Sequence, residues 1–344
     1  MNNIELLADL KEKGAGIDAV MKEDLAIIES PLLAEIIHHA IFQGGKRIRP
    51  LLTLLAAGLV GTPPADTVRL AIAFEYLHAA SLLHDDVIDH AILRRGAETA
   101  NTIWGMEPVI LAGDYLHAHA MALASEVGGP AAMALIGRAT AAMVESEFLQ
   151  MRNAREILLS EENYFSVLRG KTAALIAAAC EAGIAHNQGT AEQRLALRTY
   201  GTNLGLAFQI VDDLLDYLGD PAKTGKALGN DFQEGKMTLP LIKTMARADA
   251  RDHEVLTGLL KATPQERNRE LTLVHALVEK YQGFSLARAQ AEALLGEALA
   301  GLAIFAETPD KAELGSLPAQ TKLIPSGCKE SLTGLAHYVL SRNK

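Results

Sequence analysis

The chain has 344 residues, 49% of them hydrophobic and 5% aromatic, and a formal net charge of -10. This acidic balance argues against a general nucleic-acid binder, so no nucleic-acid partner is expected. The two cysteines, Cys180 and Cys328, lack the spacing of metal ligands and are typical of reduced thiols in a cytosolic protein. Neither a signal-peptide pattern nor a run of about 18 apolar residues is present, so we expect a cytoplasmic protein without a membrane span.

Abundant Ala and Leu with few aromatic residues favour helices over strands. No alternating pattern with hairpin signals predicts a strand anywhere. Pro31 and Pro50 fit first helical turns, and Gly44–Gly45 ends the helix between them. The expected helical segments are residues 1–30 (one or two helices), 31–42, 50–60, 66–93, 108–127, 130–152, 161–186, 191–219, 237–248, 252–262, 265–301 and 329–342.

The C-terminal residues 305–344 and the absence of linker-like segments before them predict a single domain. Residues 305–328 contain three Pro and two Gly among mixed polar residues, which predicts a loop before the closing helix. No earlier segment has a composition able to divide the helical core. We therefore expect one all-α domain over residues 1–304, with residues 305–344 as a loop and a short C-terminal helix of the same domain.

Two copies of the pattern Asp-Asp-x-x-Asp lie in apolar segments with helical spacing. The first consists of Asp85, Asp86 and Asp89, and the second of Asp212, Asp213 and Asp216. Residues four apart share one face of a helix, so the outer aspartates of each motif point the same way, although like charges there repel. Carboxylates among apolar residues are costly unless they are paired or bind a metal. The pattern therefore predicts two carboxylate walls facing one site, where Mg²⁺ bridges carboxylates and substrate phosphates.

Two cationic groups accompany the first acidic motif. Lys46 and Arg49 lie three apart at a predicted helix start, a good place for a phosphate, although a solvated charge cluster explains them equally well. Arg94 and Arg95 follow the motif and would point about 100° apart on a helix, so they can hold two different anions. Taken alone, ion pairing with Asp89 and other surface acids is the better explanation of these arginines.

Four more polar residues share a face or a turn with these features. His78 lies two helical turns before Asp85, and Gln209 lies on the face of the second motif. Lys171 and Thr172 follow a glycine and precede an apolar run, so they can offer an ammonium and a hydroxyl to a diphosphate. A core histidine, a buried amide and a helix-end charge are the simpler alternatives.

Residues 219–236 form a Gly-rich segment that carries Lys223, Lys226 and Lys236. Flexible backbone with lysines suits a lid that closes over anions. From composition alone, an ordinary surface loop is the better explanation.

In their order along the chain these residues resemble the trans-isoprenyl diphosphate synthases, the polyprenyl synthetase family. The matching elements are GGKRIRP, the first acidic motif between His78 and RRG, Lys171-Thr172, the second motif after Phe208-Gln209, and the Gly/Lys loop ending GKMTLP. Each element alone is weak, whereas the ordered set, from about residue 28 to 300, is specific. The resemblance implies an all-α isoprenoid synthase fold with helices around a deep central cavity, usually as a homodimer.

The resemblance also implies roles, residue by residue. The diphosphate of isopentenyl diphosphate would be bound by Lys46, Arg49, His78 and Arg95. The allylic diphosphate would be bound by Arg94, Lys171, Gln209 and Lys226, with Thr172 and Lys236 nearby. Two or three Mg²⁺ ions bridging the allylic diphosphate would be held by Asp85, Asp89 and Asp212, supported by Asp86, Asp213 and Asp216.

The implied reaction begins when the allylic substrate loses its diphosphate and becomes a carbocation. Cations and Mg²⁺ aimed at the leaving diphosphate stabilise the transition state. The cation then alkylates the double bond of isopentenyl diphosphate in a dry apolar cavity. No side chain resembles a strong base, so the released diphosphate is the expected proton acceptor.

The helix before the first aspartate predicts a long product. Ala80 and Ser81 lie five and four positions before Asp85, and both side chains are small. The resemblance suggests that bulky aromatic residues here block the cavity of short-chain enzymes, so we expect an open path in this chain. Phe74, about three turns back, could form a deeper floor. The expected product is octaprenyl diphosphate, with transient membrane contact to help its release; the resemblance implies that such a product becomes a quinone side chain.

Several alternatives stay open. A farnesyl or geranylgeranyl diphosphate synthase would share these motifs and make a shorter chain. A class I terpene cyclase would not need GGKRIRP, and a non-catalytic partner subunit tends to lose aspartates or arginines that this chain keeps. A plain helical scaffold leaves the paired carboxylates unexplained.

Overall fold

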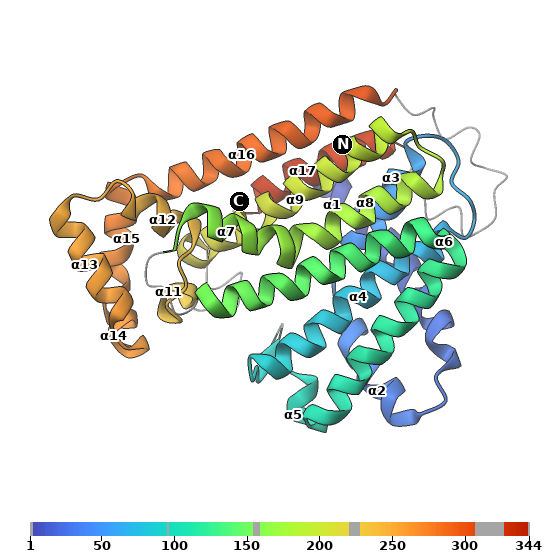
Figure 1. Ribbon diagram of the computed structural model, residues 1–344, viewed down its shortest axis with the longest axis horizontal. Helices are drawn as coiled ribbons and strands as arrows, with labels where there is room; N and C mark the ends of the chain where they lie inside the picture. Colours follow the sequence, from blue (N-terminus) through green and yellow to red (C-terminus); the bar gives the residue numbers. More distant parts are fainter. Residues whose placement is uncertain (1–2, 95, 154–158, 220–227, 307–326, 343–344) are drawn as a thin grey trace. The chain divides into compact units, whose positions relative to one another are not determined.

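The computed structural model describes residues 3–94, 96–153, 159–219, 228–306 and 327–342, with the side chains of residues 3–11 left aside. Within these ranges the chain is almost entirely helical, as predicted (Figure 1). Residue contacts divide it into two compact units. Unit 1 comprises residues 1–138, 175–198 and 302–335, and unit 2 comprises residues 139–174, 199–301 and 336–344. One domain over residues 1–304 stays a prediction.

Unit 1 contains the N-terminal helices and the first acidic motif. Its elements are α1 (Asn3–Asp24), the short helix η1 (Leu25–Ile27), α2 (Pro31–Phe42), α3 (Ile48–Gly58), α4 (Thr67–Ile88), the strands β1 (Leu93–Arg94) and β2 (Ala97–Glu98), α5 (Ala100–Trp104), the first part of α6 (Met106–Asn153), nearly all of α8 (Ala174–His186), the start of α9 (Ala191–Leu218), η3 (Leu302–Ile304) and the start of α17 (Cys328–Ser341). Helix α3 is buried along most of its length and packs against α4. Gly183 of α8 makes a close approach possible, because a Cβ there would lie 2.1 Å from the Thr53 carbonyl oxygen of α3.

Unit 2 contains the second acidic motif. Its elements are the end of α6, α7 (Glu161–Leu168), the π-helical turn η2 (Arg169–Ala173), most of α9, α11 (Asn230–Gln233), α12 (Leu239–Met245), α13 (Ala250–Lys261), α14 (Pro264–Arg269), α15 (Leu271–Lys280), α16 (Gly283–Gly301) and the end of α17. Helix α12 packs against α16 and α15, and α13, α14 and α15 follow one another as a cluster (Figure 1).

Helix α6 is long and apolar enough to cross a membrane, judged by length and composition alone. Its backbone leaves the helical range at Gly129 (φ 60°, ψ -159°), directly before Pro130, so two helical segments meet at a kink. This agrees with the predicted helices 108–127 and 130–152. A core helix of a globular protein passes the same length test, so α6 is weak evidence of a membrane span.

Three sequence predictions were wrong in detail. Residues 265–301 do not form one helix, because the backbone leaves the helical range at Glu270 (φ -97°, ψ 8°) and again at Gln282 (φ 62°), so three helices, α14 to α16, take its place. A strand pair does occur, since Leu93 pairs with Glu98 and Arg94 with Ala97. The segment 219–236 contains the short helix α11 in its described part.

Buried Arg47 joins three helices of unit 1. Its guanidinium donates to Asp18 of α1 (2.6 Å), to Glu75 of α4 (3.0 Å) and to the carbonyl oxygen of Ile41 in α2 (2.7 Å), and the side chain is 4% exposed. Arg47 also has a left-handed backbone (φ 49°) that turns the chain into α3. One of the three cations of GGKRIRP is therefore structural, while neighbouring Lys46 is exposed.

Replacing this arginine by Arg47→Leu should lower the free energy of unfolding by about 3–5 kcal/mol, because the buried carboxylate of Glu75 would lose its cation. The shift of the urea midpoint measures it. Lys46→Leu is the matched control, and its free energy of unfolding should stay within about 0.5 kcal/mol of wild type. Equal midpoints for the two variants would contradict this structural role.

Candidate active site

The first acidic motif lies at the C-terminal end of α4 in unit 1. Asp85 is half-buried, Asp86 is buried and Asp89 is exposed. Asp89 ends the helix, and its backbone N–H donates to the Asp85 carbonyl oxygen (2.8 Å). The two outer aspartates are thus one helical turn apart, with carboxylates that solvent or a ligand can reach.

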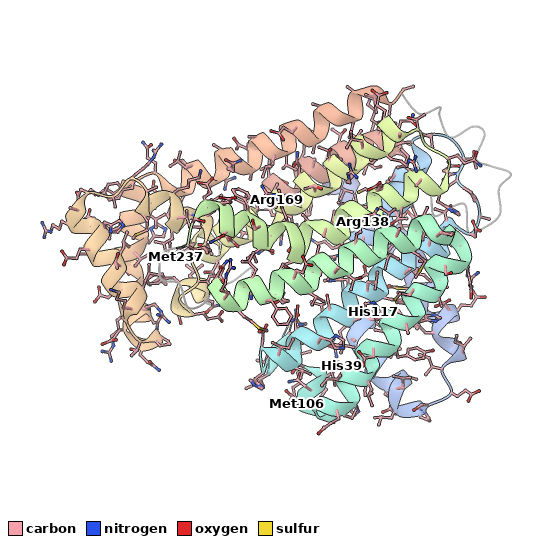
Figure 2. The ribbon with its side chains drawn as sticks, in the orientation of Figure 1. His39, Met106, His117, Arg138, Arg169 and Met237 are labelled. Carbon is pink, nitrogen blue, oxygen red and sulfur yellow. The ribbon has the colours of Figure 1, made fainter. Side chains whose placement is uncertain are left out.

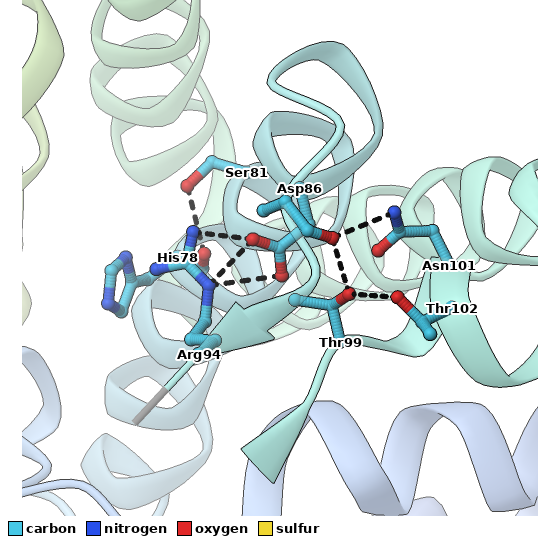
Figure 3. A network of polar contacts seen from close by, with 8 residues as sticks. His78, Ser81, Asp86, Arg94, Thr99, Asn101 and Thr102 are labelled. Atoms are coloured by element: carbon cyan, nitrogen blue, oxygen red, sulfur yellow. Dashed lines mark hydrogen bonds and ion pairs between the residues drawn. The ribbon is translucent and has the colours of Figure 1, made fainter. Parts of the chain in front are cut away.

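The middle aspartate of this motif holds Arg94. The Arg94 Nε donates to both carboxylate oxygens of Asp86 (2.8 and 3.0 Å), and Nη2 lies 2.7 Å from Oδ1 (Figure 3). Arg94 belongs to β1, so the ion pair fixes the short hairpin against α4. The structure therefore brings together two residues that the sequence placed in one site.

Polar side chains after the hairpin hold the segment that joins the motif to Arg94. The Thr99 hydroxyl donates to the Ala91 carbonyl oxygen (2.6 Å) and lies 2.9 Å from the Thr102 hydroxyl, and the Asn101 amide donates to the same carbonyl (3.1 Å) (Figure 3). His39 of α2, labelled in Figure 2, contacts the Glu98 carbonyl oxygen (2.9 Å). No local pattern predicted these contacts, because Thr99 precedes α5 and Asn101 and Thr102 lie in its first turn, where such residues indicate capping alone.

The residues expected to bind isopentenyl diphosphate differ in exposure, and one of them is not described. Lys46 is exposed, and Arg49 and His78 are half-buried; all three lie in unit 1 with the first motif. The His78 carbonyl oxygen accepts a hydrogen bond from the Ser81 hydroxyl (2.9 Å). Arg95 lies outside the described residues.

In the second motif the middle aspartate is again the buried one. Asp213 of α9 is 5% exposed and accepts hydrogen bonds from the Tyr164 hydroxyl (2.6 Å) and the Gln209 amide (3.2 Å). Burial raises the pKa of Asp213 to about 7, against the lowering effect of the Tyr164 hydrogen bond. The sequence predicted the shared position of Gln209 but gave no sign of Tyr164.

Asp216 anchors the described part of the Gly/Lys segment. Its carboxylate accepts from the backbone N–H groups of Asn230 (3.2 Å) and Asp231 (3.0 Å) at the start of α11. Burial and the nearby charge of Asp231 raise the pKa of Asp216 to about 6. Lys236 forms ion pairs with Glu234 (2.6 Å) and Asp231 (3.5 Å). Lys226 lies outside the described residues.

Lys171 and Thr172 occupy the π-helical turn between α7 and α8. A π-helical turn adds a residue to the helix and is frequent at functional sites. The Lys171 ammonium pairs with Glu147 of α6 (2.8 Å), and the Thr172 hydroxyl donates to the Gln209 side-chain oxygen (3.4 Å). Figure 2 labels Arg169, the first residue of this turn.

A residue that the sequence did not single out contacts the second motif. Arg342, beyond the end of α17, donates to Asp212 Oδ1 (2.5 Å), and its guanidinium lies 4.4 Å from the centre of the Phe208 ring. Asp212 is thus half-buried beside a cation. Arg342 and Asp212 are 130 residues apart in the sequence, so no local pattern could predict this ion pair.

Each acidic motif, taken by itself, offers oxygen donors suited to Mg²⁺. Asp85, Asp89 and Asp212 all keep exposed surface and offer the hard oxygen donors that Mg²⁺ takes. Within the described parts of the chain, no group of three His, Cys, Asp or Glu side chains converges to hold a metal.

The model of the polyprenyl synthetase family matches residues 30–277. The chain belongs to this family. It is 32% identical to the octaprenyl diphosphate synthase of Escherichia coli (strain K12), over 99% of this chain and 100% of that protein. It is 37% identical to a short chain isoprenyl diphosphate synthase of Methanothermobacter thermautotrophicus, over 75% of this chain and 80% of the relative.

A solved polyprenyl synthase from Caulobacter crescentus CB15, complexed with calcium and isoprenyl diphosphate, has a TM-score of 0.83 and 34% identity, with 100% of this chain and 98% of that chain covered. This family member thus has the all-α isoprenoid synthase fold and is a polyprenyl diphosphate synthase, a prenyltransferase. The full-length match to an octaprenyl enzyme supports the long-chain type.

Replacing the buried carboxyl by Asp213→Asn should stabilise the metal-free protein at high pH. Because the pKa of Asp213 is raised above its ordinary value, the folded state holds this proton more tightly, and stability falls as pH rises from about 4 to about 7. The gain in Tm of the variant, measured in EDTA, should therefore be larger at about pH 8 than at about pH 5. The exposed control Asp249→Asn should show no such gain. A pH-independent difference for Asp213→Asn would contradict the raised pKa.

Proposed function

We propose that this synthase adds isopentenyl diphosphate units to an allylic diphosphate in a Mg²⁺-dependent reaction and releases octaprenyl diphosphate. The observation that carries the proposal is the pair of acidic motifs, each with a buried middle aspartate that holds a neighbouring polar group. The full-length similarity to an octaprenyl enzyme supports the chain length.

In the proposed reaction, the C1–O bond of the allylic substrate breaks and the diphosphate leaves with the electron pair. Mg²⁺, when bound, neutralises charge on that leaving group. Arg94, Lys171 and Lys226 bind it as cations, and Gln209 and Thr172 orient it by hydrogen bonds. Asp86 and Asp213 keep Arg94 and Gln209 in place.

The second substrate supplies the nucleophile. Lys46, Arg49, His78 and Arg95 bind the diphosphate of isopentenyl diphosphate and hold its double bond toward the cation. The new carbon–carbon bond forms at C1 of the allylic group. A proton then leaves the isopentenyl unit for the released diphosphate, because no side chain in the proposed site is a strong base.

Ala80, Ser81 and Phe74 control the chain length in this proposal. Ser81 is half-buried and accessible, Ala80 is buried but small, and Phe74 is completely buried further along α4. A product held at Asp85 would therefore pass a small side chain at Ser81 before it meets an aromatic ring. The match to a short chain enzyme keeps the shorter product as the second candidate.

We also propose a cytoplasmic homodimer that touches a membrane only to release its product. An apolar stripe on the last part of α6 supports a partner copy. Val144, Phe148 and Met151 lie at helical spacing on one face, and Phe148 is 69% exposed. Covering such an apolar stripe with a second copy of the chain would stabilise the dimer.

Incubation with Mg²⁺, isopentenyl diphosphate and farnesyl diphosphate tests the function. Elongated polyprenyl diphosphate from the purified protein alone supports the synthase, and chromatographic sizing gives its length. A cyclic hydrocarbon would favour a cyclase. No incorporation would favour a partner subunit or scaffold and would refute the proposal.

Asp85→Ala and Asp212→Ala should each lower kcat/KM by about 10²–10³-fold, because each removes a carboxylate that would hold the Mg²⁺ needed to stabilise the leaving diphosphate. Circular dichroism should show the helical fold retained. Glu192→Ala, an exposed acid at the start of α9, is the control and should keep its activity. Near-wild-type kcat in either aspartate variant would refute the metal role.

Aromatic substitution should shorten the product. In Ser81→Phe, and in the double variant Ala80→Phe/Ser81→Phe, a ring occupies the turn before Asp85, so chains should stop at farnesyl or geranylgeranyl length while total incorporation persists. Sizing of radiolabelled products measures this. A wild type that stops at farnesyl, or variants with unchanged length, would refute the tunnel assignment.

A further inference from the structure

Tyr164 is a buried phenol to which the reaction above gives no part. It lies on α7, is 5% exposed, and donates its hydroxyl to Asp213 Oδ2 at 2.6 Å. Asp213 is itself 5% exposed. A short bond between two groups so far from solvent is a strong positional constraint, because neither can exchange its partner for water.

This bond is the first of three successive hydrogen bonds between side chains. The other oxygen of Asp213 accepts from the Gln209 amide (3.2 Å), and the oxygen of that amide accepts from the Thr172 hydroxyl (3.4 Å). This chain of hydrogen bonds thus runs from α7 through α9 to the π-helical turn. Its members on α9 and the turn are residues proposed to meet the allylic diphosphate.

Close backbone packing leaves these elements little freedom. A Cβ at Gly205 of α9 would lie 2.7 Å from Ala173 Cα, and a Cβ at Gly170 would lie 2.4 Å from the Ala142 carbonyl oxygen of α6. The turn therefore sits directly against both α9 and α6. Because packed elements move together, a change in the orientation of Asp213 reaches Thr172.

We propose that Tyr164 is a positioning residue: through Asp213 and Gln209 it aligns the second acidic motif with the Lys171–Thr172 turn, so that both meet one allylic diphosphate. The inference rests on the proposed function and extends it to a residue outside the motifs. No described residue assigned to isopentenyl diphosphate belongs to this chain of hydrogen bonds. Loss of the hydroxyl should therefore affect one substrate and not the other.

The test is Tyr164→Phe, which removes one oxygen and keeps the ring. The KM for farnesyl diphosphate should rise about tenfold, while the KM for isopentenyl diphosphate stays within about twofold, in line with the loss of one hydrogen bond to a charged group. Isothermal titration with Mg²⁺ and inorganic diphosphate gives a second readout, in which Kd should rise by a similar factor. The stoichiometry of the titration counts folded sites, so partial unfolding lowers that number and leaves Kd unchanged.

Tyr217→Phe is the matched control. Tyr217 is also a buried tyrosine, on α9 next to Asp216, but its hydroxyl meets Thr238 (3.4 Å) and not the chain of side chains. Its loss should leave both KM values and the Kd within about twofold of wild type, so that Tyr164→Phe stands apart.

A double-mutant cycle adds a test of the path. Once Gln209→Leu has broken the chain, Tyr164→Phe should cost much less than it does in wild type, because coupled residues are not additive. Additive effects, equal shifts for both substrates, or an unchanged Kd with a reduced stoichiometry would overturn the inference. If the wild type incorporates no isopentenyl diphosphate, the proposed function and this inference fail together; if it does and Tyr164→Phe matches it, only the inference fails.

Discussion

Repulsion between neighbouring carboxylates is the constraint on which the site depends. Each acidic motif carries three aspartates within five residues, an arrangement that destabilises a helix by itself. The protein gives several of these carboxylates a different partner. Asp86 binds Arg94, Asp212 binds Arg342, Asp213 accepts from Tyr164 and Gln209, and Asp216 accepts from two backbone N–H groups.

These partners divide the aspartates by task. The buried middle aspartates position other protein groups, and the more accessible outer ones keep surface available for a cation. A buried carboxylate that already accepts two hydrogen bonds gains little from a metal, whereas a half-exposed one has lone pairs to offer. In the function proposed above, this division lets a motif of three identical residues both position protein groups and bind a metal.

Glycine residues and a π-helical turn place Lys171 and Thr172. Gly205 and Gly170 have no side chain, so α9 and α6 can both lie against the turn that carries Lys171 and Thr172. Lys171 then meets Glu147, and Thr172 meets Gln209. Hydrogen bonds along α9 and the turn thus depend on backbone distances that larger residues would not permit.

The helical class, most helix positions and the acidic motifs could be predicted from the sequence, because helical period and residue spacing are local properties. The sequence also predicted that Gln209 shares a face with the second motif, since three positions make nearly one turn. It failed for residues 265–301, predicted as one helix, which are broken at Glu270 and at Gln282.

What the sequence alone determined is the order of charged motifs and the family that this order indicates. The tertiary structure decided which charges are structural. Arg47 is buried among three helices while Lys46 beside it is exposed, and Arg342 reaches Asp212 from 130 residues away. Tyr164 joins Asp213 in the same way, across 49 residues. Such pairings follow from the packing of helices distant in the chain, and no spacing within a motif encodes them.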